Sequence, residues 1–566
     1  MNFIKKIYKW CLAPEHLFFL TIIVLILPNV ALCVTERMSV LSAFANVLLP
    51  CGAYWLAMTL SRKPGKMIWW LFFFIFLAAF QLVLLYLYGR SIIAVDMFLN
   101  LVTTNPDEAM ELLDNLVPAV IGVFVVYLPI LVLGILSIMG KQVLAPRFLH
   151  NQRVIGSGVL AAGLLSLGGS YISDSEYRAE IDLYPANVVY NIILAGERTY
   201  MTEHYAETSK GFSFKAKSAT DKDTREVYVM VIGETARACD FQIYGYKRNT
   251  TPFLSKEKNI VAFTNVLSQS NTTHKSVPML MSAASAVDYG RIYKEKGIIE
   301  AFKEAGFHTT FISNQLPNHS FIDFFGKEAD DWTFIKENAK SCAGSYDTDM
   351  LDMLRDVLEK KRKKEFIVLH SYGSHFNYRD RYPRGAAFFK PDDATEAKPE
   401  NRTQLLNAYD NTIRYTDTFI HGIISLLNKS GVMSAMIYTS DHGENIFDDS
   451  RKLFLHASPI PSYYELHVPF IVWTSDKYNA LCPETVQALK NNRNKPVASS
   501  ASFFNSMLGI GNVETPYLVD SLNVGSNKLH SAPRRYLDDH NEAVTLEKIF
   551  RGDRDFSLMR QHGVKP

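Results

Sequence analysis

Two hydrophobic patterns divide the chain. Up to about residue 172, apolar residues form long continuous stretches, whereas beyond residue 226 they form short runs separated by segments of helical periodicity. Each long stretch is near the ~20 residues that cross ~30 Å of hydrocarbon. The first stretch is also too long, and lacks the cleavage site, for a cleaved signal peptide. We therefore expect a multi-span α-helical membrane domain over 1–172 with five transmembrane helices, at 16–35, 42–60, 67–88, 117–139 and 153–172.

The cationic residues of this part predict its orientation. They precede the first stretch, join the second to the third, and join the fourth to the fifth: Lys5, Lys6, Lys9, Arg62, Lys63, Lys66, Lys141, Arg147 and Arg153. Lys and Arg are enriched in cytoplasmic connections. An odd number of spans then places everything after residue 172, and the loop 89–116, on the outer face.

The remainder of the chain predicts a linker and a folded domain. Residues 173–225 mix apolar and charged positions, which is typical of helices lying at a membrane surface, and end in the polar AKSATDKDTRE. From 226 to 566, helical segments at 293–305, 346–361 and 403–429 alternate with buried strands, read as VYVMVI, TTFIS, EFIVLH, SAMIYTS and PFIVWTS. This alternation predicts an α/β domain with a largely parallel sheet.

Composition narrows the classes of function. The 566 residues are 48% hydrophobic and carry a net charge of +2, without a Lys/Arg stripe interleaved with aromatics, so we expect no nucleic-acid partner. Of the six cysteines, those outside the spans are Cys239, Cys342 and Cys482, so at most one intrachain disulfide can form there.

Polar residues that can bind a metal or take part in catalysis follow the predicted strands. Glu234 follows VYVMVIG, His370 ends EFIVLH, and Asp441-His442 follows SAMIYTS. Open α/β sheets place their sites at the carboxyl ends of strands, so these residues can converge. Two carboxylates and an imidazole suit Zn²⁺ and lack one donor. A threonine of SQSNTTHKSVPML could supply that donor and, once deprotonated, act as a nucleophile.

Further histidines extend this candidate site. His375 and His456, with His370, could hold a second metal or contact a transferred phosphate. An Asp-His pair after a strand is often only a hydrogen-bonded loop, and Gly-Glu-Thr can begin a helix. The joint occurrence of carboxylates and imidazoles at strand ends beside a hydroxyl-rich loop favours a functional site.

Several spaced motifs carry a family resemblance. VIGETARACDFQIYGYKRNTTPFL, NTTHKSVPM, AYDNTIRYTDTFI, TSDHGEN and LHASP, in this order, resemble the phosphoethanolamine transferases. These are membrane enzymes of the alkaline phosphatase and sulfatase superfamily, in the bacterial inner membrane with a periplasmic catalytic domain. The resemblance covers nearly the whole chain. It implies an α/β sulfatase/alkaline phosphatase-like domain after the spans.

The resemblance also implies roles for particular residues. Aligned on Ser276-Val277-Pro278, the family's nucleophile falls on Thr273. In the family this threonine, with the positions matching Glu234, Asp441 and His442, binds zinc. It receives phosphoethanolamine from phosphatidylethanolamine and passes it to an acceptor such as lipid A or the lipopolysaccharide core.

Other matched positions leave alternatives open. His370, His375 and His456 match family histidines, and Glu444 either shares the site or only hydrogen-bonds to a ligand. Asn105 and Glu108 resemble a segment that holds the donor's amine, but a helix N-terminus explains Asn-Pro-Asp-Glu equally well. A family lysine near the phosphate is replaced by His319, whose role stays open.

One departure concerns the nucleophile loop. Members of the family flank the nucleophile with a cysteine pair, and those positions are Gln269 and Met279 here. We expect packing and hydrogen bonds to hold the loop instead.

The resulting hypothesis is a zinc-dependent transferase with two successive displacements at Thr273. One alternative is a phosphoglycerol transferase of the same superfamily. Another, from a different class, is a catalytically silent membrane sensor or assembly factor.

Overall fold

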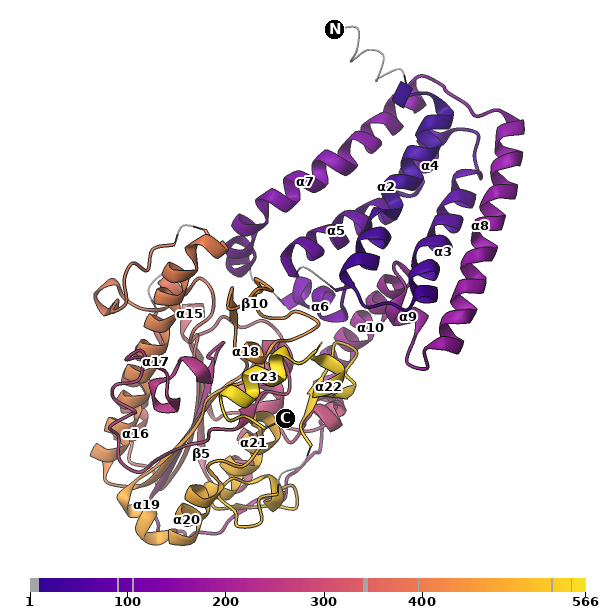
Figure 1. The fold of residues 1–566 in the computed structure, drawn as a ribbon. Coiled ribbons are helices and arrows are strands. Elements are labelled where there is room, and N and C mark those ends of the chain that lie inside the picture. Colours follow the sequence, from indigo (N-terminus) through magenta and orange to yellow (C-terminus); the bar gives the residue numbers. More distant parts are fainter. Residues whose placement is uncertain are drawn as a thin grey trace. The chain divides into compact units, whose positions relative to one another are not determined.

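The computed structural model describes residues 10–88, 91–103, 106–338, 345–394, 396–530, 533–550 and 552–565. Contacts divide the chain into two units, residues 1–102 with 112–197 and residues 103–111 with 198–566. Figure 1 shows their elements, and each unit is described separately below.

The first unit is helical. Four helical segments among the described residues are long and apolar enough to cross a membrane: Pro14–Thr35 (α2), Val40–Met58 (α3), Val117–Met139 within α7 (Pro106–Met139), and Pro146–Ser173 (α8). The third predicted span is instead a pair, α4 (Pro64–Trp70) and α5 (Phe72–Tyr88), bent by 60°. If this pair is one span, the total is five. Hydropathy does not signal the bend, because the residues on both sides of it, MIWW and FFFIF, are apolar.

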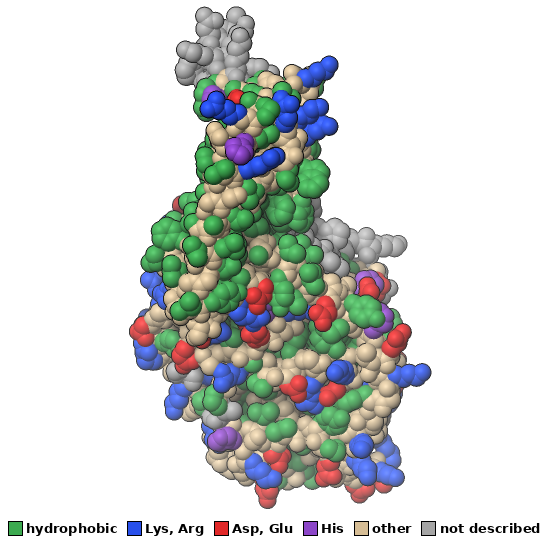
Figure 2. Space-filling view, turned by 90° about the vertical axis from the view of Figure 1, so that its right-hand side faces the viewer, with side chains coloured by type: hydrophobic (Ala, Val, Ile, Leu, Met, Phe, Trp, Pro, Cys, Tyr) green, Lys and Arg blue, Asp and Glu red, His purple; other side chains and the backbone are tan. Residues whose placement is uncertain are grey.

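Hydrophobic side chains cover much of the surface of these helices (Figure 2). Among them, Val34, Leu165 and Ile172 are 84%, 79% and 89% exposed. Contiguous apolar surface of this extent is rare on proteins surrounded by water and is typical of helices in lipid.

Two of the cationic connections lie side by side. The amide of Leu144 donates to the carbonyl of Arg62 at 2.7 Å, and Arg62 Nε donates back to the Leu144 carbonyl at 3.2 Å. Arg153 Nη2 also donates to the carbonyl of Thr59 at 3.1 Å. The connections α3–α4 and α7–α8 therefore share one end of the bundle, as the cation distribution predicts. Lys5, Lys6 and Lys9 lie outside the described residues.

Helices α3 and α8 pack closely through glycines. A Cβ atom at Gly163 of α8 would lie 2.6 Å from the backbone nitrogen of Leu49, whereas a Cβ at Gly158 would meet nothing within 4 Å. Small residues at such positions let membrane helices approach with favourable van der Waals contact.

Shorter helices lie between the spans and after them. Helix α6 (Val95–Thr103) lies between α5 and α7, whereas α9 (Ala179–Asp182), α10 (Ala186–Glu203) and α11 (Tyr205–Thr208) follow α8.

The second unit is built on a seven-stranded sheet of order β3-β11-β8-β2-β7-β5-β6. Strands β8, β2, β7, β5 and β6 are parallel, whereas β11 is antiparallel to both of its neighbours. The strands are β2 (Glu226–Gly233), β3 (Ile260–Ala262), β5 (His308–Ser313), β6 (Asp331–Phe334), β7 (Lys364–His370), β8 (Met433–Ser440) and β11 (Phe470–Thr474). All five strands read from the sequence are present, and the two that were missed, β3 and β6, are short edge strands.

Helices cover both faces of this sheet. On one face Tyr228, Met230 and Ile232 of β2 pack against α12 (Thr273–Met281), α13 (Ile298–Glu304), α14 (Phe321–Gly326) and α21 (Ser499–Ile510). On the other, Val227, Val229 and Val231 pack against α16 (Met350–Glu359) and α17 (Arg402–Ser430). Burial on both faces explains why the central strands are continuously apolar.

The remaining elements are short. The helices are α15 (Ile335–Asn338), α18 (Tyr463–Leu466), α19 (Asp476–Leu481), α20 (Pro483–Asn492), α22 (Leu546–Ile549) and α23 (Arg554–Gln561). Two-stranded pairings join β1 (Lys217–Ser218) to β13 (Val513–Glu514), β4 (Val266–Leu267) to β12 (Val497–Ala498), β9 (Asn445–Ile446) to β10 (Phe454–Leu455), and β14 (Arg535–Leu537) to β15 (Ala543–Thr545).

The glycine contact between α3 and α8 yields a stability prediction. Gly163→Ala should destabilise the first unit, because overpacking a close contact costs about 1–3 kcal/mol. Gly158→Ala makes the same change where there is open space, so it should leave stability unchanged or raise it slightly. Thermal unfolding in detergent, followed by a thiol-reactive dye, compares the two. Equal midpoints for both variants would contradict the close packing.

Candidate metal centre and nucleophile

Two neighbouring strands bring two carboxylates together. In the parallel pairing of β2 with β8, Gly233 lies opposite Ser440, so Glu234 and Asp441 follow at the same level of the sheet. The amide of Asp441 donates to the Gly233 carbonyl at 3.1 Å, which extends the pairing by one step. The site thus lies at the carboxyl edge of the sheet, as the strand ends predict.

Glu234, Asp441 and His442 form a compact set of possible metal ligands. One potential ligand atom from each lies within 4.8 Å of the others, and all three residues are buried. His442 Nε2 is 3.2 Å from Asp441 Oδ2 and 3.6 Å from Glu234 Oε1. His442 Nδ1 lies 2.9 Å from the carbonyl of Gly443, to which it donates, so the lone pair is on Nε2. Two carboxylates and an imidazole nitrogen suit a divalent metal.

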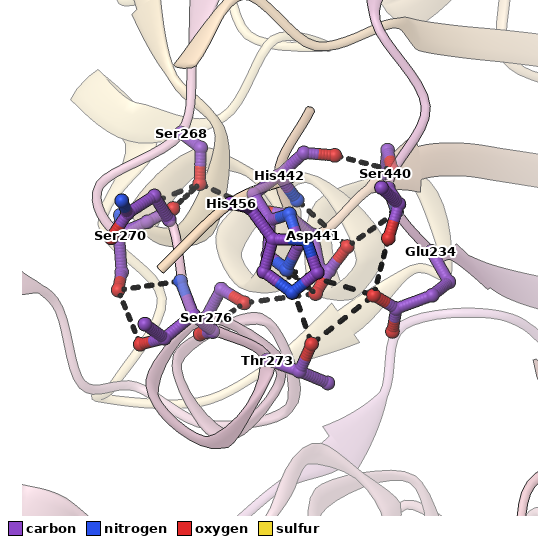
Figure 3. Close-up of polar contacts among 12 residues, drawn as sticks. Glu234, Ser268, Ser270, Thr273, Ser276, Ser440, Asp441, His442 and His456 are labelled. Carbon is purple, nitrogen blue, oxygen red and sulfur yellow. Dashed lines mark hydrogen bonds and ion pairs between the residues drawn. The ribbon is translucent and has the colours of Figure 1, made fainter. Parts of the chain in front are cut away.

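The hydroxyl of Thr273 lies against this set (Figure 3). Its Oγ1 is 3.1 Å from Glu234 Oε1 and 3.1 Å from His442 Nε2. Thr272 differs, because its Oγ1 lies 3.1 Å from Ser270 Oγ. Thr273 is also the first residue of α12, and the N-terminus of a helix favours negative charge. The geometry therefore distinguishes Thr273 from its neighbour.

Burial controls the protonation of this cluster. Burial raises the pKa of the Glu234 carboxyl, and the nearby Asp441 carboxylate adds to the shift. Burial likewise raises the pKa of Asp441 and lowers that of His442 to about 4. Among the described residues, the ion-pair contacts of these two carboxylates lead only to His442, whose imidazole is neutral, so a bound cation would supply positive charge.

Hydrogen bonds hold the two carboxylates in place. Asp441 Oδ1 accepts from the amides of Thr235 and His442 at 3.1 and 2.7 Å, and Oδ2 accepts from Ser276 Oγ at 3.2 Å. Glu234 Oε2 accepts from Gln315 Nε2 at 3.2 Å. Sequence analysis missed Ser276 and Gln315 as supporting residues. The Ser-Val-Pro motif marks the first, whereas the loop that contains Gln315 carries no comparable signal.

The turns that present these residues are tightly constrained. Thr235 has a φ of +60°, an uncommon value for a threonine, and its carbonyl accepts from the Tyr409 hydroxyl at 2.8 Å. Tyr409 belongs to the AYDN motif, so the structure gives this motif a supporting role. A Cβ at residue 443 would lie 2.1 Å from the carbonyl oxygen of Tyr464, which explains the glycine of Asp-His-Gly.

Two of the other predicted histidines lie beside the cluster. The His456 ring centroid is 4.2 Å from that of His442 and 6.0 Å from that of His375. His456 Nδ1 lies 3.0 Å from Glu444 Oε1, and His375 Nδ1 lies 2.6 Å from the Phe376 carbonyl. Burial lowers the pKa of His456 to about 4 and lowers that of His375 well below its usual value. Glu444 therefore hydrogen-bonds to a site histidine, one of the two alternatives.

Other candidate residues are placed differently. His370 is buried, with Nδ1 3.1 Å from Ser313 Oγ, and His319 is exposed on the loop before α14. Among the described residues, no hydrogen bond or ion pair joins either histidine to Glu234, Thr273, Asp441 or His442. Asn105 lies outside the described residues. Glu108 falls in α7, but its side chain is not described.

The cysteines leave the nucleophile loop without a disulfide. Cys239 and Cys482 are free, and Cys342 lies outside the described residues. Gln269 and Met279 are both buried, so the loop is held by packing and hydrogen bonds, as expected.

Comparison with known proteins agrees with this fold. The sequence profile of the sulfatase family matches residues 226–513, half of the chain. The chain belongs to the sulfatase family.

Several curated relatives of the chain are named phosphoethanolamine transferases, which confirms the resemblance. The chain is 31% identical over 288 residues to Kdo(2)-lipid A phosphoethanolamine 7''-transferase from Escherichia coli K12, covering 48% of this chain and 47% of that protein. The chain thus spans about half the length of the curated relatives it matches.

Solved structures match over a longer stretch. Full-length lipooligosaccharide phosphoethanolamine transferase A from Neisseria meningitidis matches with a TM-score of 0.69 and 20% identity, covering 90% of this chain and 97% of that one. The periplasmic domain of EptC from Escherichia coli, in complex with Zn, matches with a TM-score of 0.55 and 21% identity, covering 60% and 97%. These matches support a helical membrane domain followed by a sulfatase-like α/β domain.

The raised carboxyl pKa values predict how the metal-free protein responds to pH. Between the ordinary carboxyl pKa of about 4 and the raised values, the folded state binds more protons than the unfolded state, so stability should fall as pH rises. Asp441→Asn removes one of these groups and should flatten the dependence. Asp352→Asn, at an exposed site, should leave it unchanged. Unfolding midpoints of chelator-treated protein from pH 5 to 8 test this, and parallel curves for all three proteins would refute it.

Proposed function

We propose that this protein transfers phosphoethanolamine from phosphatidylethanolamine to an envelope glycolipid, through a covalent intermediate on Thr273. One observation carries the proposal, the Thr273 hydroxyl 3.1 Å from both Glu234 Oε1 and His442 Nε2. A hydroxyl held against acidic and imidazole ligands is suited to nucleophilic attack. The matched relatives, which are named phosphoethanolamine transferases, support the choice of transferred group.

Zinc fits the residues of the cluster. Glu234, Asp441 and His442 would hold it together with Thr273, because their potential ligand atoms converge in a buried cluster that the Thr273 hydroxyl contacts. When bound, zinc would supply positive charge that lowers the pKa of the threonine hydroxyl and neutralises the phosphoryl oxygens. The Zn complex of the related EptC domain supports this choice of metal.

Two displacements account for the reaction. In the first, Thr273 Oγ forms a bond to phosphorus, the bond from phosphorus to the glycerol oxygen breaks, and the proton of the threonine passes to that oxygen, releasing diacylglycerol. In the second, a hydroxyl or phosphate of the acceptor attacks phosphorus and the Thr273 oxygen leaves, regaining a proton. The N-terminus of α12 favours the negative charge that develops near Thr273.

His375 and His456 occupy the side of the cluster next to His442. Their Nδ1 atoms are hydrogen-bonded within the protein, so Nε2 is the nitrogen of each that would bind a substrate or a metal. In this proposal they bind the phosphoryl oxygens or hold a second metal. His370 and His319 remain candidates for binding the phosphoryl group or a second metal; their described contacts are with Ser313 and Asp323.

The proposed substrates are lipids of the bacterial cell envelope, so we infer that the protein acts there. The apolar helices support a multi-pass protein of the bacterial inner membrane, and the cation distribution supports a periplasmic catalytic domain. Lipid A or the lipopolysaccharide core is the proposed acceptor, in line with the acceptor named in the matched relatives. Asn105 and Glu108 remain candidates for binding the donor's amine.

The nucleophile is tested by trapping the intermediate. Incubated with phosphatidylethanolamine and no acceptor, the wild-type protein should carry phosphoethanolamine on a peptide that contains Thr273, because the second displacement has no attacking group. Thr273→Ala should carry none, and Thr272→Ala should behave as wild type. Peptide mass spectrometry distinguishes these results. A phosphoglycerol adduct from phosphatidylglycerol would instead identify a phosphoglycerol transferase, and the absence of any adduct would favour a catalytically silent protein.

The metal is tested by elemental analysis. Purified wild-type protein should contain zinc, and Asp441→Ala should lose most of it, because one of its ligands is gone. A second group of possible ligands, Asp538, Asp539 and His540, provides the control. His540→Ala should retain the zinc of the wild type. Zinc that is kept in Asp441→Ala and lost in His540→Ala would place the metal away from Thr273.

A further inference from the structure

The loop that carries Thr273 is bound along one side by a hairpin near the C-terminus. Strand β14 (Arg535–Leu537) pairs with β15 (Ala543–Thr545), and a short loop of residues 538–542 joins them. The pairing with β15 occupies one edge of β14. The other edge faces residues 269–275, which are the last residues before α12 and its first turn.

Consecutive residues of the hairpin contact the segment that carries the nucleophile. The amide of Leu537 donates to the Gln269 carbonyl at 2.7 Å, and Gln269 Nε2 donates to the Arg535 carbonyl at 3.3 Å. The Tyr536 hydroxyl donates to Asn271 Oδ1 at 2.6 Å. Lys275, two residues beyond the nucleophile, donates from Nζ to the Asp538 carbonyl at 2.7 Å.

The Lys275 contact involves a buried charge. Lys275 is 2% exposed, and burying an ammonium group is costly unless hydrogen bonds and opposite charge compensate. Asp538 fixes its own loop, because its carboxylate accepts from the amides of His540 and Glu542 at 3.0 and 2.8 Å. The hairpin loop is thus a rigid acceptor for Lys275.

Asn271 connects the hairpin to the other side of the site. Its side-chain Nδ2 donates to the Ser458 carbonyl and to Glu465 Oε1, both at 2.8 Å. Its backbone carbonyl accepts from the Ala457 amide at 3.2 Å. Ala457 directly follows His456. The same asparagine therefore joins the segment of His456, the loop of Thr273 and Tyr536 of the hairpin.

We propose that the β14–β15 hairpin is a brace that positions the nucleophile, with Lys275 and Tyr536 as its positioning residues. Neither residue is assigned a contact with substrate or metal. The brace fixes the backbone from Gln269 to Lys275, so that the Thr273 hydroxyl stays within reach of Glu234 and His442. A displacement of about 1 Å at a reacting group can cost about 100-fold in rate, which is why such a brace matters. This inference rests on the proposed function only for its kinetic consequence.

Hydrogen exchange tests the brace without assuming any activity. In Lys275→Met, amides in peptides covering residues 268–281 should exchange about 10- to 100-fold faster, because a charge-assisted hydrogen bond that closes the loop is lost. Tyr536→Phe should also make these amides exchange faster. Because it removes only a hydroxyl, it tests the brace if Lys275→Met does not fold. Lys528→Met, which changes a lysine that is 76% exposed, is the matched control and should exchange as wild type.

A kinetic measurement tests the consequence for Thr273. The single-turnover rate of adduct formation should fall about tenfold or more in Lys275→Met, while KM for phosphatidylethanolamine changes less than about twofold. Lys275→Arg, which retains the charge and the donor, should recover most of the rate.

The outcomes separate the two proposals. Exchange in residues 268–281 equal to that of Lys528→Met in both variants would overturn the brace. So would a slower adduct rate with unchanged exchange, which would assign Lys275 to the chemistry itself. Failure of the wild-type protein to form any adduct would overturn the proposed function, whereas the exchange comparison would still decide the brace.

Discussion

The burial of two carboxylates at the ends of neighbouring strands is the constraint on which the second unit depends. Parallel pairing of β2 with β8 places Glu234 and Asp441 at the same level, inside a domain covered by helices on both faces. Water cannot solvate these groups there, so the protein must compensate them with hydrogen-bond donors and positive charge. The amides of Thr235 and His442 and the hydroxyl of Ser276 supply hydrogen-bond donors for Asp441.

The sequence predicted the central fold because its signals are local. Each inner strand is a short apolar run, and the parallel strands β2 and β8 are followed by polar residues at the carboxyl edge, so both the sheet and the convergence of Glu234, Asp441 and His442 could be inferred. Edge strands β3 and β6 were missed, because strands of three or four residues with partly exposed faces carry little pattern. The bend between α4 and α5 was missed for a related reason, since hydropathy reports apolar length and not direction.

The supporting contacts could not be predicted, because they join residues far apart in the chain. Gln315 reaches Glu234 across 81 positions, and Tyr536 reaches Asn271 across 265. No periodicity or motif records such pairs in a single sequence. The contact of His370 could not be predicted either. It ends a strand next to β2, and its Nδ1 lies 3.1 Å from Ser313 Oγ, a contact that position at a strand end does not determine.

The arrangement around Thr273 suggests how a reactive hydroxyl can be held without a covalent bridge. A disulfide restricts a loop mainly by removing conformations from the unfolded chain, whereas the contacts here restrict the loop only when the hairpin is folded. Positioning therefore depends on residues more than 260 positions beyond the nucleophile. The polar contacts of this loop differ in kind. Gln269 pairs through its backbone, Asn271 through its side-chain amide, and Lys275 through a buried ammonium group. Loss of any one leaves the others, so the loop should loosen in steps and not all at once.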